Sequence, residues 1–242
     1  MRFFYVINFA ELNKRIEEPF MLYKLVPRPI KKIVYEKLRL LMRAYRFNVN
    51  KEIPLYSLNE KHIGNLKVLV NRTALLEVLP KGGDVAEIGV HKGEFAKVIW
   101  DISAPKKLHL IDSWGDPNRS HAGLKNLVEE KFKDQIAESR VDLNVGLSTA
   151  IIPTFPANYF DWVYADTDHS YSLTIRELNL LKDKIKPNGI IAGHDYTLGN
   201  WVDDVRYGVV EAVHEFCVKE NWEIIYLTIE TDHYKSFAIR KL

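Results

Sequence analysis

The sequence predicts an α/β protein with a doubly wound, mostly parallel sheet and a helical extension at its N-terminus. Short runs of β-branched and aromatic residues alternate with longer stretches of helical periodicity from about residue 84 onward. Parallel strands need such crossover connections, which are right-handed and place helices on both faces of a sheet. The last two apolar runs, 222–230 and 236–242, are separated only by a short turn. They predict a hairpin, so the final strand should enter the sheet antiparallel.

The composition is that of an ordinary globular protein. The 242 residues are 47% hydrophobic, 27% charged and 12% aromatic, which is enough for one sizeable core with an added subdomain. A single cysteine, Cys217, excludes an internal disulfide framework and a zinc site built from several cysteines. Because Cys217 lies on the apolar face of a predicted helix, we expect it in the core.

The first residues do not have the pattern of a targeting signal. The opening "MRFFYVINFA" is apolar, but it lacks a small-residue cleavage site and runs into the charged stretch "ELNKRIEE". No apolar run is long enough to span a bilayer as a helix. We therefore expect a cytoplasmic protein, peripheral at most to the inner face of a membrane.

Positive charge is concentrated in residues 20–51, which hold nine lysines and arginines and one acid, Glu36. This segment carries +8 and the whole chain +2, so the remaining residues carry −6. Residues 29–47 place apolar side chains at helical spacing and basic ones on another face. Either this helix packs on the main domain, or it is a basic amphipathic helix that meets an anionic membrane surface or substrate. We expect residues 1–61 to form this extension and residues 62–242 the main domain, without nucleic-acid binding.

The elements of the main domain are predicted in chain order. A helical pattern over residues 63–76 ends at the turn signal "PKGG". Strands are then predicted at 84–89, 107–114, 141–146, 160–168, 189–196, 222–230 and 236–242. The helices predicted between them are 93–103, 122–139, 172–185 and 209–220.

The stretch "VAEIGVHKGEF" has the residues of a ligand-binding turn between a strand and a helix. Gly89 and Gly93 permit a tight turn and the close approach of a ligand to the start of the helix. Asp112 ends the next strand, where a carboxylate can accept hydrogen bonds from ribose hydroxyls. His91 crowds the turn, and Glu87 would repel a phosphate but attract an ammonium group. The turn therefore favours S-adenosylmethionine (SAM) over a dinucleotide.

Two further strands end in titratable side chains. The segment "YADTDHSY" contributes Asp166, Asp168 and His169, and "GHDY" contributes His194 and Asp195. Because neighbouring parallel strands end at the same edge of a sheet, we expect these side chains to lie close together. Buried carboxylates are costly without a cation or hydrogen-bond partners, so the cluster indicates a catalytic or metal site. The other interpretation is that these residues cap helices.

Together these motifs resemble class I SAM-dependent methyltransferases. The resemblance is carried by the glycine turn, the acid in "LIDSW", the segments "YADTDHSY" and "IKPNGIIAGHDY", and the closing hairpin. More narrowly, the pair "DTDHSY" and "GHDY" is similar to the metal-dependent sugar O-methyltransferases of macrolide and aminocoumarin biosynthesis. The resemblance covers about residues 71–242. It implies a Rossmann-like sheet of seven strands in the order 3-2-1-4-5-7-6.

The resemblance also implies roles for individual residues. Asp166 and Asp195 match metal ligands, and His169, with Asp168 beside it, matches the general base. His194 stands where those relatives carry an acid. If it is a third ligand, Mn²⁺ or another transition metal suits the site better than Mg²⁺; otherwise His194 is a second base, or no metal binds. The residues implied to bind the cofactor are Glu87, Gly89, Gly93, Asp112, Ser113, Gly146, Ser148 (also a plausible helix N-cap) and Asp166.

We therefore expect a SAM-dependent O-methyltransferase that acts on a hydroxyl of a small molecule, a sugar or a glycosylated metabolite, with a divalent cation, Mg²⁺ or Mn²⁺. Two other classes stay open: a NAD-dependent oxidoreductase, and a non-catalytic module that binds a nucleotide or a membrane surface. The loop that contains Asp203 and Asp204 is a candidate lid over the acceptor. A homo-oligomer is compatible with the sequence.

Overall fold

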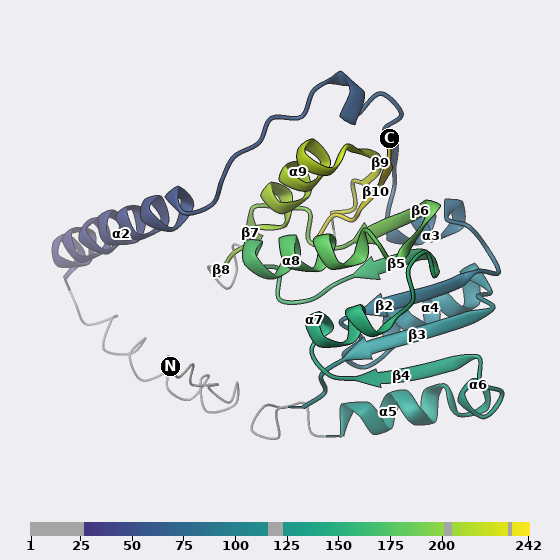
Figure 1. Ribbon diagram of the computed structural model, residues 1–242. Helices are drawn as coiled ribbons and strands as arrows, with labels where there is room; N and C mark the ends of the chain where they lie inside the picture. The colour runs from purple at the N-terminus through teal and green to yellow at the C-terminus, as the bar shows by residue number, and fades with distance from the viewer. Residues whose placement is uncertain (1–26, 116–122, 201–204, 232–233) are drawn as a thin grey trace. The chain divides into compact units, whose positions relative to one another are not determined.

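The chain divides into two units, Met1–Ile53 and Pro54–Leu242, so the boundary lies a short way before the predicted one at residue 61. The computed structural model (Figure 1) describes residues 27–115, 123–200, 205–231 and 234–242. Residues 20–26 of the predicted basic segment and the candidate lid residues Asp203 and Asp204 lie outside the described residues.

The second unit is built around a sheet of eight strands, which are β1 (Lys67–Leu69), β2 (Asp84–Ile88), β3 (Lys107–Asp112), β4 (Val141–Val145), β5 (Phe160–Ala165), β6 (Ile185–Gly193), β9 (Trp222–Thr228) and β10 (Phe237–Lys241). Their order is β1-β9-β10-β6-β5-β2-β3-β4. Strand β10 runs antiparallel to β6 and β9, and the other paired strands are parallel. Without β1, this is the implied order, and the antiparallel last strand is confirmed.

Residues 63–76, predicted as one helix, instead form the edge strand β1 and the start of helix α3 (Arg72–Val78). Lys67 to Leu69 pair in parallel with Tyr226 to Thr228 of β9. Asn71 then begins a new helix, because its side-chain oxygen accepts a hydrogen bond from the Ala74 amide at 2.9 Å. The helix prediction was wrong because a short apolar run fits both periodicities, and backbone pairing decides between them. The sheet therefore has eight strands and not seven.

Helices cover both faces of this sheet (Figure 1). The helices that follow α3 are α4 (Glu94–Ser103), α5 (Leu124–Lys131), α6 (Lys133–Ala137), α7 (Ser148–Ile151), α8 (Tyr171–Leu181) and α9 (Val209–Glu220). One buried cluster packs α3, α4 and α5 on the sheet, and a second packs α8 and α9 on the other face. The stretch predicted as one helix over 122–139 is divided at Phe132. Short elements complete the unit: the 3₁₀ turns η1 (Glu60–His62) and η2 (Ile152–Thr154) and the paired strands β7 (Gly199–Asn200) and β8 (Val205–Arg206).

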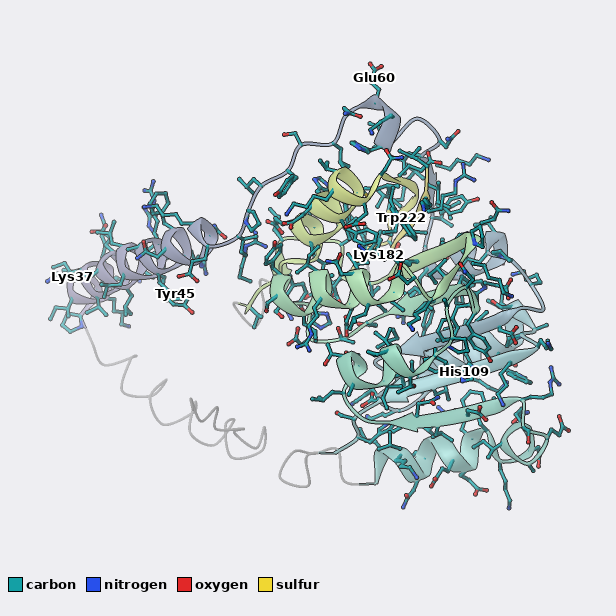
Figure 2. All side chains as sticks on the ribbon, viewed as in Figure 1. Lys37, Tyr45, Glu60, His109, Lys182 and Trp222 are labelled. Atoms are coloured by element: carbon teal, nitrogen blue, oxygen red, sulfur yellow. The ribbon has the colours of Figure 1, made fainter. Side chains whose placement is uncertain are left out.

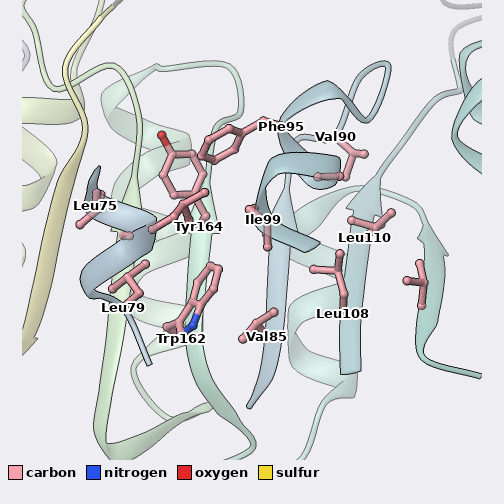
Figure 3. Packing of buried hydrophobic residues seen from close by; sticks show 14 of the residues in the cluster. Leu75, Leu79, Val85, Val90, Phe95, Ile99, Leu108, Leu110, Trp162 and Tyr164 are labelled. Carbon is pink, nitrogen blue, oxygen red and sulfur yellow. The ribbon is translucent and has the colours of Figure 1, made fainter. Parts of the chain in front are cut away.

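Aromatic side chains of β5 anchor the first cluster. Trp162 and Tyr164 are fully buried, beside Leu79 at the end of α3 and Ile99 of α4 (Figure 3). The Tyr164 ring lies 4.6 Å from that of Phe95 at the start of α4, and the Trp162 indole donates a hydrogen bond to the Pro80 carbonyl at 2.9 Å. Burying each such side chain stabilises the fold by roughly 2 kcal/mol. The helix that follows the glycine turn is thus fixed against the centre of the sheet.

The order of the strands reverses between β2 and β5, which are neighbours in the sheet. In open parallel sheets, ligands bind at the carboxyl ends of the strands beside such a reversal. The two strand ends approach closely there: the Asp166 amide donates to the Ile88 carbonyl at 2.8 Å. A Cβ atom on Gly89 would lie 1.8 Å from the Asp166 carbonyl oxygen. Only glycine fits this position.

The first unit contains helix α2 (Arg28–Lys51), which confirms the helix predicted over residues 29–47 and extends it. Its large apolar side chains, such as Leu41 and Tyr45, are exposed. Among the described residues, no helix combines the length and the hydrophobicity needed to cross a lipid bilayer.

Replacing Gly89 with alanine should lower the free energy of unfolding by about 3 kcal/mol, because the added methyl group would overlap the Asp166 carbonyl. Gly82→Ala is the matched control. Gly82 also has a left-handed backbone (φ +68°), but no atom lies within 4 Å of a Cβ built there, so only about 1 kcal/mol of strain is expected. Urea denaturation measures both. Equal losses in the two variants would show that the close approach is not what requires glycine.

Candidate active site

Asp112 holds the glycine turn by hydrogen bonds to its backbone. One carboxylate oxygen accepts from the amides of Val90 and His91, each at 2.8 Å, and the other accepts from the Trp114 amide at 2.9 Å. The Trp114 indole donates to the His91 carbonyl at 2.9 Å. A carboxylate has about four lone-pair positions, so these bonds leave about one for a ligand hydroxyl. Asp112 therefore fixes the conformation of the turn.

Glu87 is a buried acid in the middle of the sheet, on β2 opposite Tyr164 of β5. Burial raises its pKa well above the ordinary value, and the charge of Asp166 raises it further, whereas Arg72 opposes the rise. Its Oε2 atom has no hydrogen-bond partner in the described part of the chain. A buried, unpaired carboxylate oxygen beside a ligand-binding turn fits an ammonium group.

The ends of β5 and β6 bring four of the five predicted titratable side chains together. The Asp195 Oδ2 atom lies 2.8 Å from His169 Nδ1 and 3.3 Å from His194 Nδ1. His194 Nδ1 is also 3.6 Å from Asp166 Oδ2. Asp195 is almost fully buried, whereas His169 is half-buried at the edge. Two acids and two imidazoles thus form one compact cluster at the reversal of strand order.

The charges in this cluster shift one another's pKa values. Burial raises the pKa of Asp195, but hydrogen bonds from His169 and His194 outweigh it and hold the pKa well below its usual range. Burial raises the pKa of Asp166, and the neighbouring Asp195 adds to this rise while the imidazoles oppose it. Burial lowers the pKa of His169, yet the hydrogen bond and charge of Asp195 produce a net rise. Asp195 therefore stays ionised to a lower pH than Asp166 does.

The backbone at the cluster is held in an uncommon conformation. His169 and Asp195 both have left-handed dihedrals, with φ of 62° and 57°. The Gly208 amide donates to the His169 carbonyl at 2.8 Å, and the Tyr207 ring lies 4.6 Å from the His169 ring. A Cβ on Gly208 would lie within 2.5 Å of Tyr171, so glycine is required there. Strain of this kind is typical of positions whose side chains must point in a set direction.

The sequence around this site matches a known protein family. Residues 86–196 match the model of a family described as a methyltransferase domain, a span that contains the turn, Asp112 and the cluster. These residues form a SAM-dependent methyltransferase domain. The match decides against the NAD-dependent oxidoreductase and the non-catalytic module. No curated protein matches the sequence.

Solved structures with this fold include several methyltransferases. A candidate rRNA methylase from Clostridium thermocellum has a TM-score of 0.54 and 15% identity, over 72% of this chain and 97% of that one. Precorrin-6y C5,15-methyltransferase from Geobacter metallireducens has a TM-score of 0.52 and 12% identity, over 71% and 86% of the two chains. At these identities the likeness shows the shared fold alone.

The other predicted site residues of the methyltransferase domain lie around the cluster. Asp168, predicted as catalytic, is exposed, and its Oδ1 atom accepts hydrogen bonds from the Ser170 amide and hydroxyl at 2.9 and 2.7 Å. This geometry favours a structural role for Asp168, which holds Ser170, the N-cap of α8. Ser113 is exposed at the tip of β3, and the Gly146 amide donates to the Asp112 carbonyl at 2.9 Å. The tips of β3 and β4 thus meet at the same edge.

Glu177 is a functional candidate that the sequence analysis missed. It lies on α8, is 2% exposed, and accepts hydrogen bonds from Thr167 Oγ1 at 2.9 Å and from Ser148. It thereby connects the loop after β4 with the loop that carries the cluster. Ser148 is the first residue of α7 and not its N-cap. An acid four residues before the buried Leu181 and three after the buried Thr174 was the signal that could have identified Glu177.

A cavity of about 630 Å³ opens beside the glycine turn. Its walls come from the start of α3, the start of α4 and the end of β9, and include Asn71, Arg72, Thr73, Glu94, Phe95 and Glu230. The Arg72 guanidinium lies 4.4 Å from the centre of the Phe95 ring, and the Arg72 amide donates to Glu230 at 3.2 Å. In the described residues this guanidinium has no carboxylate partner. The cavity is polar, and its lining includes side chains of positive and of negative charge.

The cluster fits a divalent cation, with one change from the predicted ligand set. One donor atom each from Asp166, His169 and Asp195 lies within 4.8 Å of the others. His169, predicted only as a base, stands in this group in place of His194. The Nε2 atom of His194 is buried without a hydrogen-bond partner in the described structure. Two carboxylates and an imidazole suit Mn²⁺ better than Mg²⁺.

Replacing Glu177 with glutamine should remove a pH dependence of stability. Burial raises the pKa of Glu177 from 4.5 to about 7, although Ser148 and Thr167 donate hydrogen bonds to it. An acid with a raised folded-state pKa destabilises the fold as the pH rises from its unfolded to its folded value. The variant should gain about 2 kcal/mol over the wild type between pH 5 and pH 8, as measured by urea denaturation. Glu129→Gln, at an exposed site on α5, is the control. The same gain in both variants would contradict the assignment.

Proposed function

We propose that the methyltransferase domain transfers the methyl group of SAM to a hydroxyl of a sugar-like small molecule, with His169 as the general base and a divalent cation at the cluster. The observation that supports this most is the hydrogen bond of 2.8 Å between His169 and Asp195, beside Asp166 and next to the glycine turn. A hydroxyl is a poor nucleophile while it is protonated, so O-methylation needs a base at the site of transfer.

The proton would pass from the acceptor hydroxyl to His169. Because Asp195 accepts the hydrogen bond from Nδ1, the Nε2 atom carries the lone pair and can take the proton. Asp195 stabilises the imidazolium that forms, and it raises the pKa of His169 in the folded protein. The Tyr207 ring packs on the imidazole and limits its rotation.

A divalent cation, when bound, lowers the pKa of a coordinated hydroxyl and fixes its position. Asp166 and Asp195 would hold it, because each has an oxygen at the cluster and their mutual repulsion is relieved by a positive charge. His169 or His194 offers an imidazole nitrogen as a further ligand. His169 cannot serve as ligand and base through the same atom, so we assign the base to its Nε2 atom and coordination to the carboxylates.

The charges beside the turn match the amino-acid end of SAM. Glu87 offers an unpaired buried oxygen for the ammonium group, and Arg72 offers its guanidinium for the carboxylate. The two side chains are near enough for Arg72 to affect the pKa of Glu87. Arg72 lines the 630 Å³ cavity, whose remaining polar walls, among them Asn71 and Thr73, suit an acceptor with many hydroxyl groups.

Mn²⁺ should bind to the wild-type protein, and Asp166→Asn should weaken that binding at least about 100-fold, because it removes a ligand charge at the cluster. Asp168→Asn is the matched control, two residues away and outside the cluster. Titration calorimetry with Mn²⁺ measures both variants, and titration with S-adenosylhomocysteine tests cofactor binding separately. If both variants kept the wild-type affinity for Mn²⁺, the metal assignment would be wrong. If the wild type did not bind S-adenosylhomocysteine, the proposed function itself would fail.

Arg72→Gln should weaken the binding of S-adenosylhomocysteine about 10-fold, because the carboxylate loses a charged partner. It should leave the affinity for 5′-methylthioadenosine, which lacks the amino-acid group, within about two-fold. Arg140→Gln is a close control, since Arg140 also stacks on an aromatic ring, 4.5 Å from the centre of Trp100. Calorimetry with both ligands decides the point. An equal loss for both ligands would show that Arg72 supports the fold and not the carboxylate.

A further inference from the structure

Helix α2 presents an apolar face with no cover among the described residues. Ile30, Val34, Leu38, Leu41 and Tyr45 follow one another at intervals of three and four residues, so they share one side of the helix. Each of them is between 47% and 68% exposed. Figure 2 shows the side chains of this helix, with Tyr45 labelled among them. An exposed apolar surface of this size marks an interaction site.

The other side of α2 is basic. Lys32, Arg39, Arg43 and Arg46 lie seven, four and three residues apart and share a second face. The helix as a whole holds eight lysines and arginines and one acid, Glu36. Its net charge is therefore +7, in a chain whose total charge is +2.

We propose that α2 lies flat on an anionic lipid surface. In that position the apolar face enters the boundary between the headgroups and the acyl chains, and the basic face meets the anionic headgroups. By helical spacing Lys37 lies at the border of the apolar face, but a lysine can bury its methylene stem and extend its ammonium group to the headgroups. With 24 residues, the helix is about 36 Å long, which is ample for interfacial binding.

The apolar face and the basic face of α2 together argue against two other binding partners, nucleic acid and a second copy of the chain. Nucleic acid would pair with the basic face but would leave Leu38, Leu41 and Tyr45 in water. A second copy of the chain could cover the apolar face, but it would bring a second helix of charge +7 alongside the first. An anionic bilayer removes the apolar face from water and also neutralises the charge of the basic face.

Co-sedimentation of the full chain with vesicles tests the proposal. The protein should bind vesicles of phosphatidylcholine with about one-third phosphatidylglycerol, and should bind pure phosphatidylcholine at least about 20-fold more weakly. A variant with Lys32→Gln, Arg39→Gln, Arg43→Gln and Arg46→Gln should lose most of this binding. Each basic residue strengthens it about five-fold, so a loss of at least 50-fold is expected. A variant with Leu38→Gln and Leu41→Gln should bind at least 10-fold more weakly with its charge unchanged.

The matched control carries four charge-removing changes in the second unit: Lys67→Gln, Lys106→Gln, Lys133→Gln and Lys241→Gln. It should keep the wild-type affinity for the vesicles within about two-fold, and circular dichroism should show equal helix content in all variants. Equal binding to neutral vesicles, a control as weak as the α2 variants, or binding of duplex DNA without binding of vesicles would overturn the proposal. Binding of S-adenosylhomocysteine is measured alongside, and its presence or absence does not bear on α2.

Discussion

The close approach of two strand ends is the constraint on which the site depends. The turn after β2 passes so near to the end of β5 that position 89 has no room for a side chain. This approach brings the amide-lined glycine turn beside Asp166, whose own amide closes the gap to Ile88. Asp112 then fixes the far side of the turn through three backbone amides. The glycine turn proposed for the cofactor and the titratable cluster therefore lie at the same edge of the sheet.

The distribution of charge at this edge follows from burial. Glu87 and Glu177 are acids whose pKa values are raised chiefly by loss of water. Asp195 is equally buried, but two imidazoles donate hydrogen bonds to it and keep it ionised. The ionised Asp195 places negative charge directly beside His169. In the proposed reaction that charge would stabilise the proton taken up by His169.

The order of the strands could be predicted because strand and helix periods alternate clearly from residue 84 onward and because the closing hairpin is short. The edge strand β1 could not, since three residues of backbone pairing with β9 leave almost no pattern. Because neighbouring parallel strands end at the same edge of the sheet, the sequence predicted that Asp166, His169 and Asp195 lie close together, and they do. It did not distinguish Asp168, because side-chain direction depends on local dihedrals. The exposed Asp168 side chain accepts hydrogen bonds from Ser170, the N-cap of α8. Glu177 was missed because it approaches the site from a helix face.

Positive charge in this chain is concentrated in one segment, and this separates the two proposed activities. Residues 20–51 carry +8 and the remaining residues −6, so an anionic surface would attract the first group and repel the second. Contact with such a surface would then depend on α2 and not on the methyltransferase domain. An acceptor confined to the same surface would be held at a high effective concentration near the enzyme without any added contact in the active site. On this view, the polar cavity would set which hydroxyl is methylated, and α2 would set where the reaction takes place.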